Sequence, residues 1–319
     1  MNILTPKIEF YRLRNFTDKL NATFQFIREN WKPLIKFTFY MLLPICLIQT
    51  LVMNSIVSTA FRMGANDAYF NTFNSANFFF INYGLFIFCA MIGSILLAAL
   101  VYALMQTYEQ REYRLVNTQW SDFKEFIIKN AKRCIALIVF GIVTFLLLAI
   151  ALGVVGSVLF STTSSIVFTI FMIFVFLFLI MIICIPLSLV MPIYIFDTKI
   201  SLGDTVAKAW KWGFNHFWSL LGFLIVISII SYVLQTVTMA PWYITLLVGN
   251  ILSLNSDPSL TQSVFYKFAI YILGLIQSMG NYISMIILLI GLAFQYFHLR
   301  EKFEGVTIES NITNFNELQ

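Results

Sequence analysis

Long uninterrupted runs of apolar residues are the feature that most limits what this chain can fold into. Each run has about 20 or more residues, which is enough for a helix to cross a hydrocarbon layer of roughly 30 Å. Lipid offers no hydrogen-bond partners, so only helices and closed barrels can cross it, and the continuous apolar pattern excludes a barrel. We therefore predict an all-α integral membrane protein with six transmembrane helices, at about 34–56, 78–106, 134–159, 166–196, 218–239 and 268–298.

The composition agrees with a membrane protein. Hydrophobic residues make up 60% of the chain and charged residues only 11%, whereas a soluble domain has roughly half apolar and about a quarter charged residues. We treat residues 1–305 as a single transmembrane domain and residues 306–319 as a polar tail on the cytoplasmic side. Residues 1–14 are polar and basic, and we expect them to form a loose lead-in to the first helix.

Positive charge is concentrated on one side of this topology. Every Lys and Arg except Arg62 and Lys267 falls in or beside the N-terminal segment, the segments that follow the second and fourth spans, or the tail. Lys and Arg accumulate in the cytoplasmic loops of membrane proteins. The distribution therefore places both termini in the cytoplasm and supports an even number of spans.

Three basic segments on that side have the periodicity of amphipathic helices. Apolar side chains recur at helical spacing in 15–32, 122–133 and 201–217, with polar residues such as Lys19 on the opposite face. Helices of this kind lie in the membrane interface. Each begins with a residue suited to an N-cap and has an acid three positions later, which favours the positive end of the helix. These pairs are Asn15 and Asp18, Asp122 and Glu125, and Ser201 and Asp204.

The shared pattern has two explanations. Each predicted interfacial helix precedes two spans, so the chain could consist of three tandem repeats of a surface helix plus a helical hairpin. Alternatively, the similarity is only the spacing that any amphipathic helix shows. The sequence leaves both explanations open.

Several connecting segments carry further signals. Pro33, Pro186 and Pro192 stand near the ends of predicted helices, and each removes a backbone donor and favours a bend. Residues 160–165 are expected to form a tight turn between the third and fourth spans. Residues 240–262 contain an apolar stretch that is too short to cross the membrane, and we expect it to be re-entrant or interfacial.

No set of residues has the spacing of a catalytic or metal-binding motif. None of the acids falls in the middle of a predicted span, which argues against a proton-coupled pump. The two histidines, His216 and His298, stand near the predicted cytoplasmic edge of the membrane, without the further ligands that an iron site needs. We therefore predict that the protein is not an enzyme and holds no metal or cofactor.

Polar side chains follow one face of each of the last two spans, and on the sixth span this face extends to Gln295. Small and polar residues at this spacing let helices approach closely and hydrogen-bond in lipid. The simpler interpretation is that these residues only pack the two helices together. The more specific interpretation is that they line a polar cavity for a lipid headgroup or a small solute. The residues of this possible polar seam are Ser228, Ser231, Gln235, Gln277, Asn281 and Ser284.

A basic and aromatic surface on the second and third interfacial segments is the other candidate site. Tryptophans anchor membrane proteins at the level of the headgroups, and each well-placed cation contributes about 1 kcal/mol of attraction to anionic lipid. We expect membrane lipids, anionic ones above all, and another membrane protein as partners, but no nucleic acid. The residues of this possible lipid-headgroup surface are Lys129, Lys132, Arg133, Lys208, Trp210, Lys211 and Trp212.

The stretch from Pro192 to Gly222 resembles a broad family of bacterial six-span proteins. It contains Pro192-Ile-Tyr-Ile-Phe-Asp197, then a helix with Ala209-Trp210 near its middle, and then the aromatic entry Phe217-Trp-Ser-Leu-Leu-Gly222. The best-named group in this family is the membrane domain attached to some glycerophosphodiester phosphodiesterases. The resemblance implies a six-span architecture in a bacterial membrane. It implies no activity, because the function of the family is largely unknown and no stretch of this sequence corresponds to the phosphodiesterase domain.

These observations favour a non-enzymatic, multi-pass protein of the bacterial cytoplasmic (inner) membrane, which organises lipids or docks a partner through its basic surface helices. The alternative is a transporter or channel for a small uncharged or amphiphilic solute, which the two polar faces suggest. An intramembrane lipid enzyme is a third and weaker hypothesis, because no pair of nucleophile and base is recognisable.

Overall fold

The computed structural model describes residues 6–65, 73–163, 166–255 and 263–307, and their regular structure is helical throughout. Six of the helices are long and apolar enough to cross a membrane, which confirms the predicted all-α, six-span fold. The elements are α1 (Phe16–Ala65), α3 (Phe73–Gln110), η1 (Trp120–Asp122), α4 (Lys124–Thr163), α5 (Ile166–Leu187), α6 (Val190–Phe196), α7 (Leu202–Asn215), α8 (Phe217–Asn255) and α10 (Val264–Glu304).

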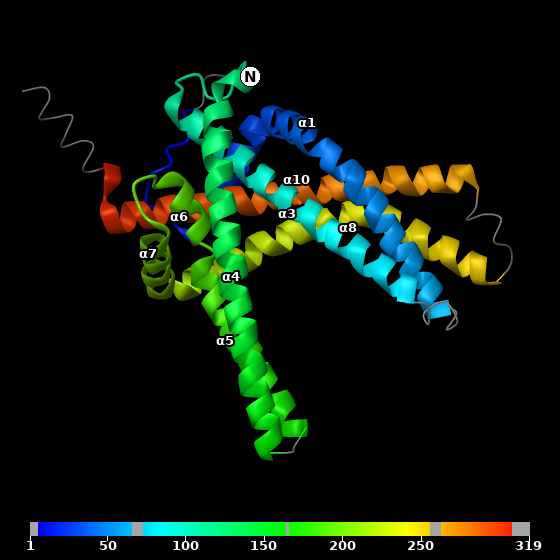
Figure 1. Cartoon of the computed structure of the whole chain (residues 1–319). Coiled ribbons are helices and arrows are strands. Elements are labelled where there is room, and N and C mark those ends of the chain that lie inside the picture. Colours follow the sequence, from blue (N-terminus) through cyan, green and yellow to red (C-terminus); the bar gives the residue numbers. More distant parts are fainter. Residues whose placement is uncertain (1–5, 66–72, 164–165, 256–262, 308–319) are drawn as a thin grey trace, which may run out of the picture.

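The spans form two arms that diverge from a common end (Figure 1). Helices α1, α3, α8 and α10 pack together in one arm, while α4 and α5 project as a hairpin in the other. The short helices α6 and α7 lie at the common end, together with the start of α1 and the last turns of α10. We call this common end the polar end; it also includes the described residues before α1, residues 111–123, and the first turns of α4 and α8.

Helix α10 is the centre of the larger arm. In its most apolar stretch 72% of the residues are buried, against 6% in the corresponding stretch of α4. Glycines allow the close packing: a Cβ atom built on Gly280 would lie 2.2 Å from Oγ1 of Thr238, and one on Gly274 would lie 2.7 Å from Cγ2 of Thr50. Small residues at such contacts let helix backbones approach closely in lipid.

An aromatic cluster joins the N-terminal segment to the helices. The ring of Phe10 stacks at 4.8 Å on Phe297 of α10 and at 5.6 Å on Tyr108 of α3, and it meets Phe26 of α1 at 6.1 Å. The backbone N–H of Ile8 donates to the hydroxyl of Tyr108 over 3.1 Å. The expectation of a loose lead-in is therefore wrong for residues 6–14, because two of their apolar side chains, Ile8 and Phe10, are buried.

The predicted bend between the first surface segment and the first span is present inside one long helix. The helical backbone of α1 is interrupted at Asn30, with φ −119° and ψ 18°, three residues before Pro33. Proline at this position has no N–H to donate to the preceding turn. At the bend itself, the Asn30 side chain donates to the carbonyl of Phe26 over 2.9 Å and so satisfies that backbone acceptor.

The second surface segment differs from its prediction. Asp122 does not cap an α-helix: it ends η1, and its carboxylate accepts from the N–H of Gln119 over 2.7 Å. Helix α4 then runs from Lys124 to Thr163 without a break, so residues 124–133 are continuous with the third span. In the third segment the predicted N-cap is confirmed, because Ser201 caps α7 by accepting from the N–H of Asp204 over 3.2 Å.

The prolines near the fourth span also act as predicted, while the segment after the fifth span does not. The span is divided into α5, which ends at Leu187 just after Pro186, and α6, which begins at Val190. The re-entrant or interfacial stretch expected in 240–262 is instead the continuation of α8, which passes through Pro241 and extends to Asn255. The last part of that stretch, 256–262, lies outside the described residues, as do 164–165 and the tail beyond residue 307. The tight turn expected at 160–165 is wrong for 160–163, which are the last residues of α4.

Trp242 explains why α8 continues. Its side chain is only 2% exposed, and its indole N–H donates to Oδ1 of Asn54 in α1 over 3.0 Å. Leu246 and Ile270 complete a small buried cluster with it. These contacts between α1, α8 and α10 hold the extra turns inside the larger arm.

We predict that Gly280→Ala weakens the packing of α8 on α10. The added methyl group would overlap Thr238, and overpacking of this kind costs about 1–3 kcal/mol. Thermal unfolding of the purified protein in detergent should show a lower midpoint for this variant.

Gly141→Ala is the matched control for this variant. A Cβ at Gly141 in α4 meets nothing within 4 Å, and alanine favours the helix over glycine by up to about 1 kcal/mol. Its midpoint should not fall. Equal losses in the two variants would contradict the close packing at Gly280.

Candidate functional site

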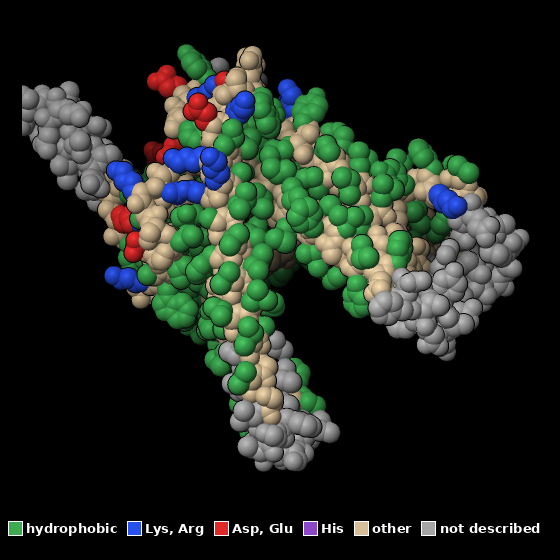
Figure 2. All heavy atoms as spheres, viewed as in Figure 1, with side chains coloured by type: hydrophobic (Ala, Val, Ile, Leu, Met, Phe, Trp, Pro, Cys, Tyr) green, Lys and Arg blue, Asp and Glu red, His purple; other side chains and the backbone are tan. Residues whose placement is uncertain are grey.

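Charged side chains gather at the polar end, while apolar side chains cover the outer surface of both arms in the view of Figure 2. Each of the five described ion pairs lies there. Arg111 pairs with Asp122 at 2.9 Å, and Arg114 pairs with Glu29 at 3.0 Å. The polar end is therefore where this molecule can recognise a charged ligand or headgroup.

Lys208 of α7 is the centre of one ionic contact. Its ammonium lies 3.0 Å from Oδ2 of Asp197 and 2.5 Å from Oε1 of Glu304, and 4.6 Å from the centre of the Trp212 ring. Burial acts to raise the pKa of the Asp197 carboxyl, but the hydrogen bond and charge of Lys208 outweigh it and hold that pKa below its usual range. Lys208, one of the predicted headgroup residues, is thus already paired within the protein.

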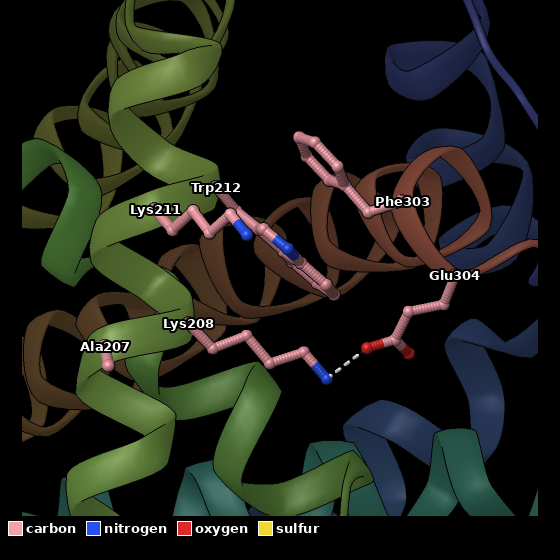
Figure 3. A pocket seen from close by; sticks show the side chains of 6 residues that line it. All are labelled: Ala207, Lys208, Lys211, Trp212, Phe303 and Glu304. Carbon is pink, nitrogen blue, oxygen red and sulfur yellow. Dashed lines mark ion pairs between the residues drawn. The ribbon is translucent and has the colours of Figure 1, made fainter.

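A pocket of about 430 Å³ opens beside this contact. Lys208 and Glu304 reach toward each other across it from α7 and from the end of α10 (Figure 3). The Trp212 ring stacks on Phe303 with 5.4 Å between ring centres. The pocket therefore combines an aromatic wall, an ion pair and the exposed ammonium of Lys211.

Arg133 likewise has a partner in the fold. Its guanidinium donates to the backbone carbonyls of Tyr194, Asp197 and Thr198, the last two over 3.0 and 2.8 Å, and lies 4.4 Å from the centre of the Tyr194 ring. These carbonyls belong to the end of α6 and the turn after it, where a helix leaves acceptors without intrahelical donors. Arg133 therefore ties α4 to the end of α6.

The remaining residues of the predicted headgroup surface are turned outward. Lys129 and Lys132 are exposed on α4, as are Lys211 and Trp210 on α7. Trp212, in contrast, is only 5% exposed. The structure thus divides the seven predicted residues into four that are open to the surroundings and three, Arg133, Lys208 and Trp212, that serve contacts within the polar end.

The possible polar seam lies between α8 and α10. The side-chain amide of Gln235 donates to Oδ1 of Asn281 over 2.9 Å, and the hydroxyl of Ser284 donates to the carbonyl of Asn281 over 2.7 Å. The Oγ atom of Ser231 is buried without a hydrogen-bond partner among the described residues, whereas Ser228 is exposed. Gln277 accepts from Ser278 over 3.4 Å. The structure therefore brings Gln235 and Asn281 into direct contact, as helix packing requires.

A cluster of basic side chains at the polar end was not predicted. Lys19, expected on the polar face of its segment, is only 2% exposed, and its ammonium donates to Oε1 of Gln295 over 2.7 Å. Nearby, the Lys302 ammonium donates to Nε2 of His216 over 2.7 Å, and Nδ1 of His298 accepts from the backbone N–H of Arg14 over 3.0 Å. The only sequence signal was that the polar face of the sixth span continues to Gln295.

Comparisons with known proteins leave the function to be argued from these contacts. The chain matches no protein-family model, no curated protein sequence and no solved structure. Within the described ranges, no group of three His, Cys, Asp or Glu side chains is placed to hold a metal ion.

We predict that Arg133→Gln destabilises the protein by at least about 2 kcal/mol, because a single hydrogen bond to a charged group contributes roughly 1.5–3 kcal/mol and Arg133 makes more than one. The loss would leave carbonyls at the end of α6 without their donor. Thermal unfolding in detergent measures this loss of stability.

Lys132→Gln, one position away and exposed, is the control and should change stability by less than about 0.5 kcal/mol. Equal effects would show that the contacts of Arg133 contribute no stability.

Proposed function

We propose that this polytopic membrane protein is a non-enzymatic element of the bacterial cytoplasmic membrane that binds anionic lipid headgroups at its polar end. The observation that carries the proposal is the exposed set of Lys129, Lys132 and Lys211 on helices whose adjoining surfaces are apolar. A cation near an anionic membrane surface contributes about 1 kcal/mol of attraction. Three of them at one end of the molecule would enrich anionic lipid around the protein.

Two further features support this proposal. Trp210 and Trp218 are 44% and 81% exposed at the polar end, as expected of side chains that anchor a protein among headgroups. The cations that are bound internally, Arg133 and Lys208, fix α4, α6 and α7 relative to one another. The exposed lysines of α4 and α7 would therefore be presented on a rigid support, which suits lipid organisation or the docking of a second membrane protein.

The proposal requires that the polar end lie in the cytoplasm. We predict that short epitope tags inserted after Glu112 and after Lys199 become accessible on the same side of the membrane, because the two spans α4 and α5 separate them. Antibody binding to inside-out and right-side-out vesicles measures this. Tags on opposite sides would disprove the six-span topology, and tags that are both extracellular would disprove the cytoplasmic position.

We predict that replacing Lys129, Lys132 and Lys211 together by Gln reduces the preference for anionic lipid. The protein would be reconstituted in nanodiscs of phosphatidylcholine with a minority of phosphatidylglycerol, and the retained lipids would be counted by native mass spectrometry. A contribution of about 1 kcal/mol corresponds to about a fivefold preference at each lysine.

Lys267→Gln is the matched control, because this exposed lysine lies near the start of α10, far along the helix from the polar end. It should leave the lipid preference unchanged. If the triple variant also retains phosphatidylglycerol as the unmodified chain does, the proposed lipid function is wrong.

A further inference from the structure

The ammonium of Lys19 is buried without a carboxylate partner. No ion pair within 4.0 Å joins it to an acid in the described part of the chain, and its contacts are Oε1 of Gln295 at 2.7 Å and the ring of Phe223, whose centre lies 5.4 Å away. Buried charges in proteins are normally paired. Lys19 therefore lacks the counter-charge that its burial calls for.

Gln295, the partner of Lys19, also has a hydrogen-bond donor without an acceptor in the part of the chain that the structure describes. Its side chain is fully buried, and its carbonyl oxygen is turned toward Lys19 because it accepts the ammonium hydrogen bond. The amide nitrogen of the same side chain, Nε2, is buried and has no acceptor among the described residues. A buried donor without an acceptor is rare in native proteins, and a bound ion or ligand is one of the usual reasons. Lys19 and Gln295 together therefore present N–H groups that call for an acceptor.

The surrounding charges are also positive. The positive charge of Lys302 acts on Lys19, and the positive charges of Lys19, Lys302 and Arg14 act on His298. Burial and the charges of Lys302 and Lys19 hold the pKa of His216 below its usual range. Lys302 is exposed, so the cluster extends from a buried donor pair to the surface.

The start of helix α8 also lies at this place, next to the end of α7. Helix α8 begins at Phe217, directly after His216, and its first N–H groups have no partners within the helix. The N-terminus of a helix favours an anion. Phe223 in the second turn of α8 contacts both Lys19 and Phe16, which places the start of α8 against the start of α1.

We propose that Lys19, Gln295 and Lys302 form part of a binding site for a phosphate group. A phosphate supplies several acceptor oxygens and a negative charge, which are what the two buried donors and the cations around them lack. The source is either the headgroup of a membrane lipid or free inorganic phosphate. In the lipid case the inference rests on the proposed function and names a specific headgroup site, distinct from the exposed lysines of α4 and α7.

The first experiment uses the full chain in neutral detergent and titrates inorganic phosphate against chloride at constant ionic strength, with thermal unfolding followed by tryptophan fluorescence. The second uses nanodiscs of phosphatidylcholine with a minority of phosphatidic acid and counts the retained lipids by native mass spectrometry. A saturable rise of the midpoint indicates free phosphate. Retention of phosphatidic acid without that rise indicates a lipid headgroup. Either result supports the site if the response is also weakened in the Gln295→Glu and Lys19→Met variants.

Gln295→Glu is the decisive variant, because a carboxylate beside Lys19 would supply the missing counter-charge from within the protein. It should keep the fold, raise the midpoint in phosphate-free buffer and weaken the phosphate response at least tenfold. Lys19→Met should weaken the response similarly, while Lys267→Met should leave it unchanged. The triple Gln variant of Lys129, Lys132 and Lys211 should also leave it unchanged, which separates this test from that of the proposed function.

Two results would overturn the proposal. In one, the unmodified chain responds to neither inorganic phosphate nor phosphatidic acid, which is the outcome expected if Lys19 is held as a neutral amine. In the other, Gln295→Glu binds phosphate as the unmodified chain does. The Gln295→Glu variant also guards against misfolding, because a gain in stability cannot come from a damaged structure.

Discussion

The close packing of α10 against its neighbours is the constraint on which the larger arm depends. Apolar side chains gain little by leaving lipid for a protein interior, so helices in a membrane associate through close contact and hydrogen bonds. Gly274 and Gly280 supply the contact, and the Gln235–Asn281 bond joins α8 to α10. Helix α10 therefore holds α1, α3 and α8 in one body and also carries Gln295 and Lys302 into the polar end.

The polar end uses its charges in two ways. Arg133 and Lys208 are occupied by carbonyls and carboxylates of the same chain, and they fix the short helices α6 and α7. Lys129, Lys132 and Lys211 remain exposed. A basic surface of this kind attracts anionic lipid without selecting one headgroup, whereas the site proposed at the buried donors of Lys19 and Gln295 would recognise a phosphate group.

The sequence was most reliable where one physical requirement dominated. Apolar length alone predicted that there are six spans, and the cap at Ser201 was correct because its hydroxyl oxygen accepts from the N–H of Asp204 while the hydroxyl group donates to the Asp204 carboxylate. Predictions from the sequence failed where contacts between residues far apart in the chain decide how long a helix is or which side chain is buried. The bond from Trp242 to Asn54 keeps α8 helical beyond the expected end of the span, and Phe10 is buried by aromatic rings from three helices.

By itself the sequence determined the helical, membrane-spanning class of the protein and the gathering of its cations in a few segments, because both depend on the solvation of side chains and backbone along the chain. Only the tertiary structure decided which of those cations are available. Lys19 and Lys132 are equally polar in a sequence pattern, yet one is buried against Gln295, 276 positions away, and the other faces outward. Burial is a property of the neighbours that folding brings together, and no local pattern records them.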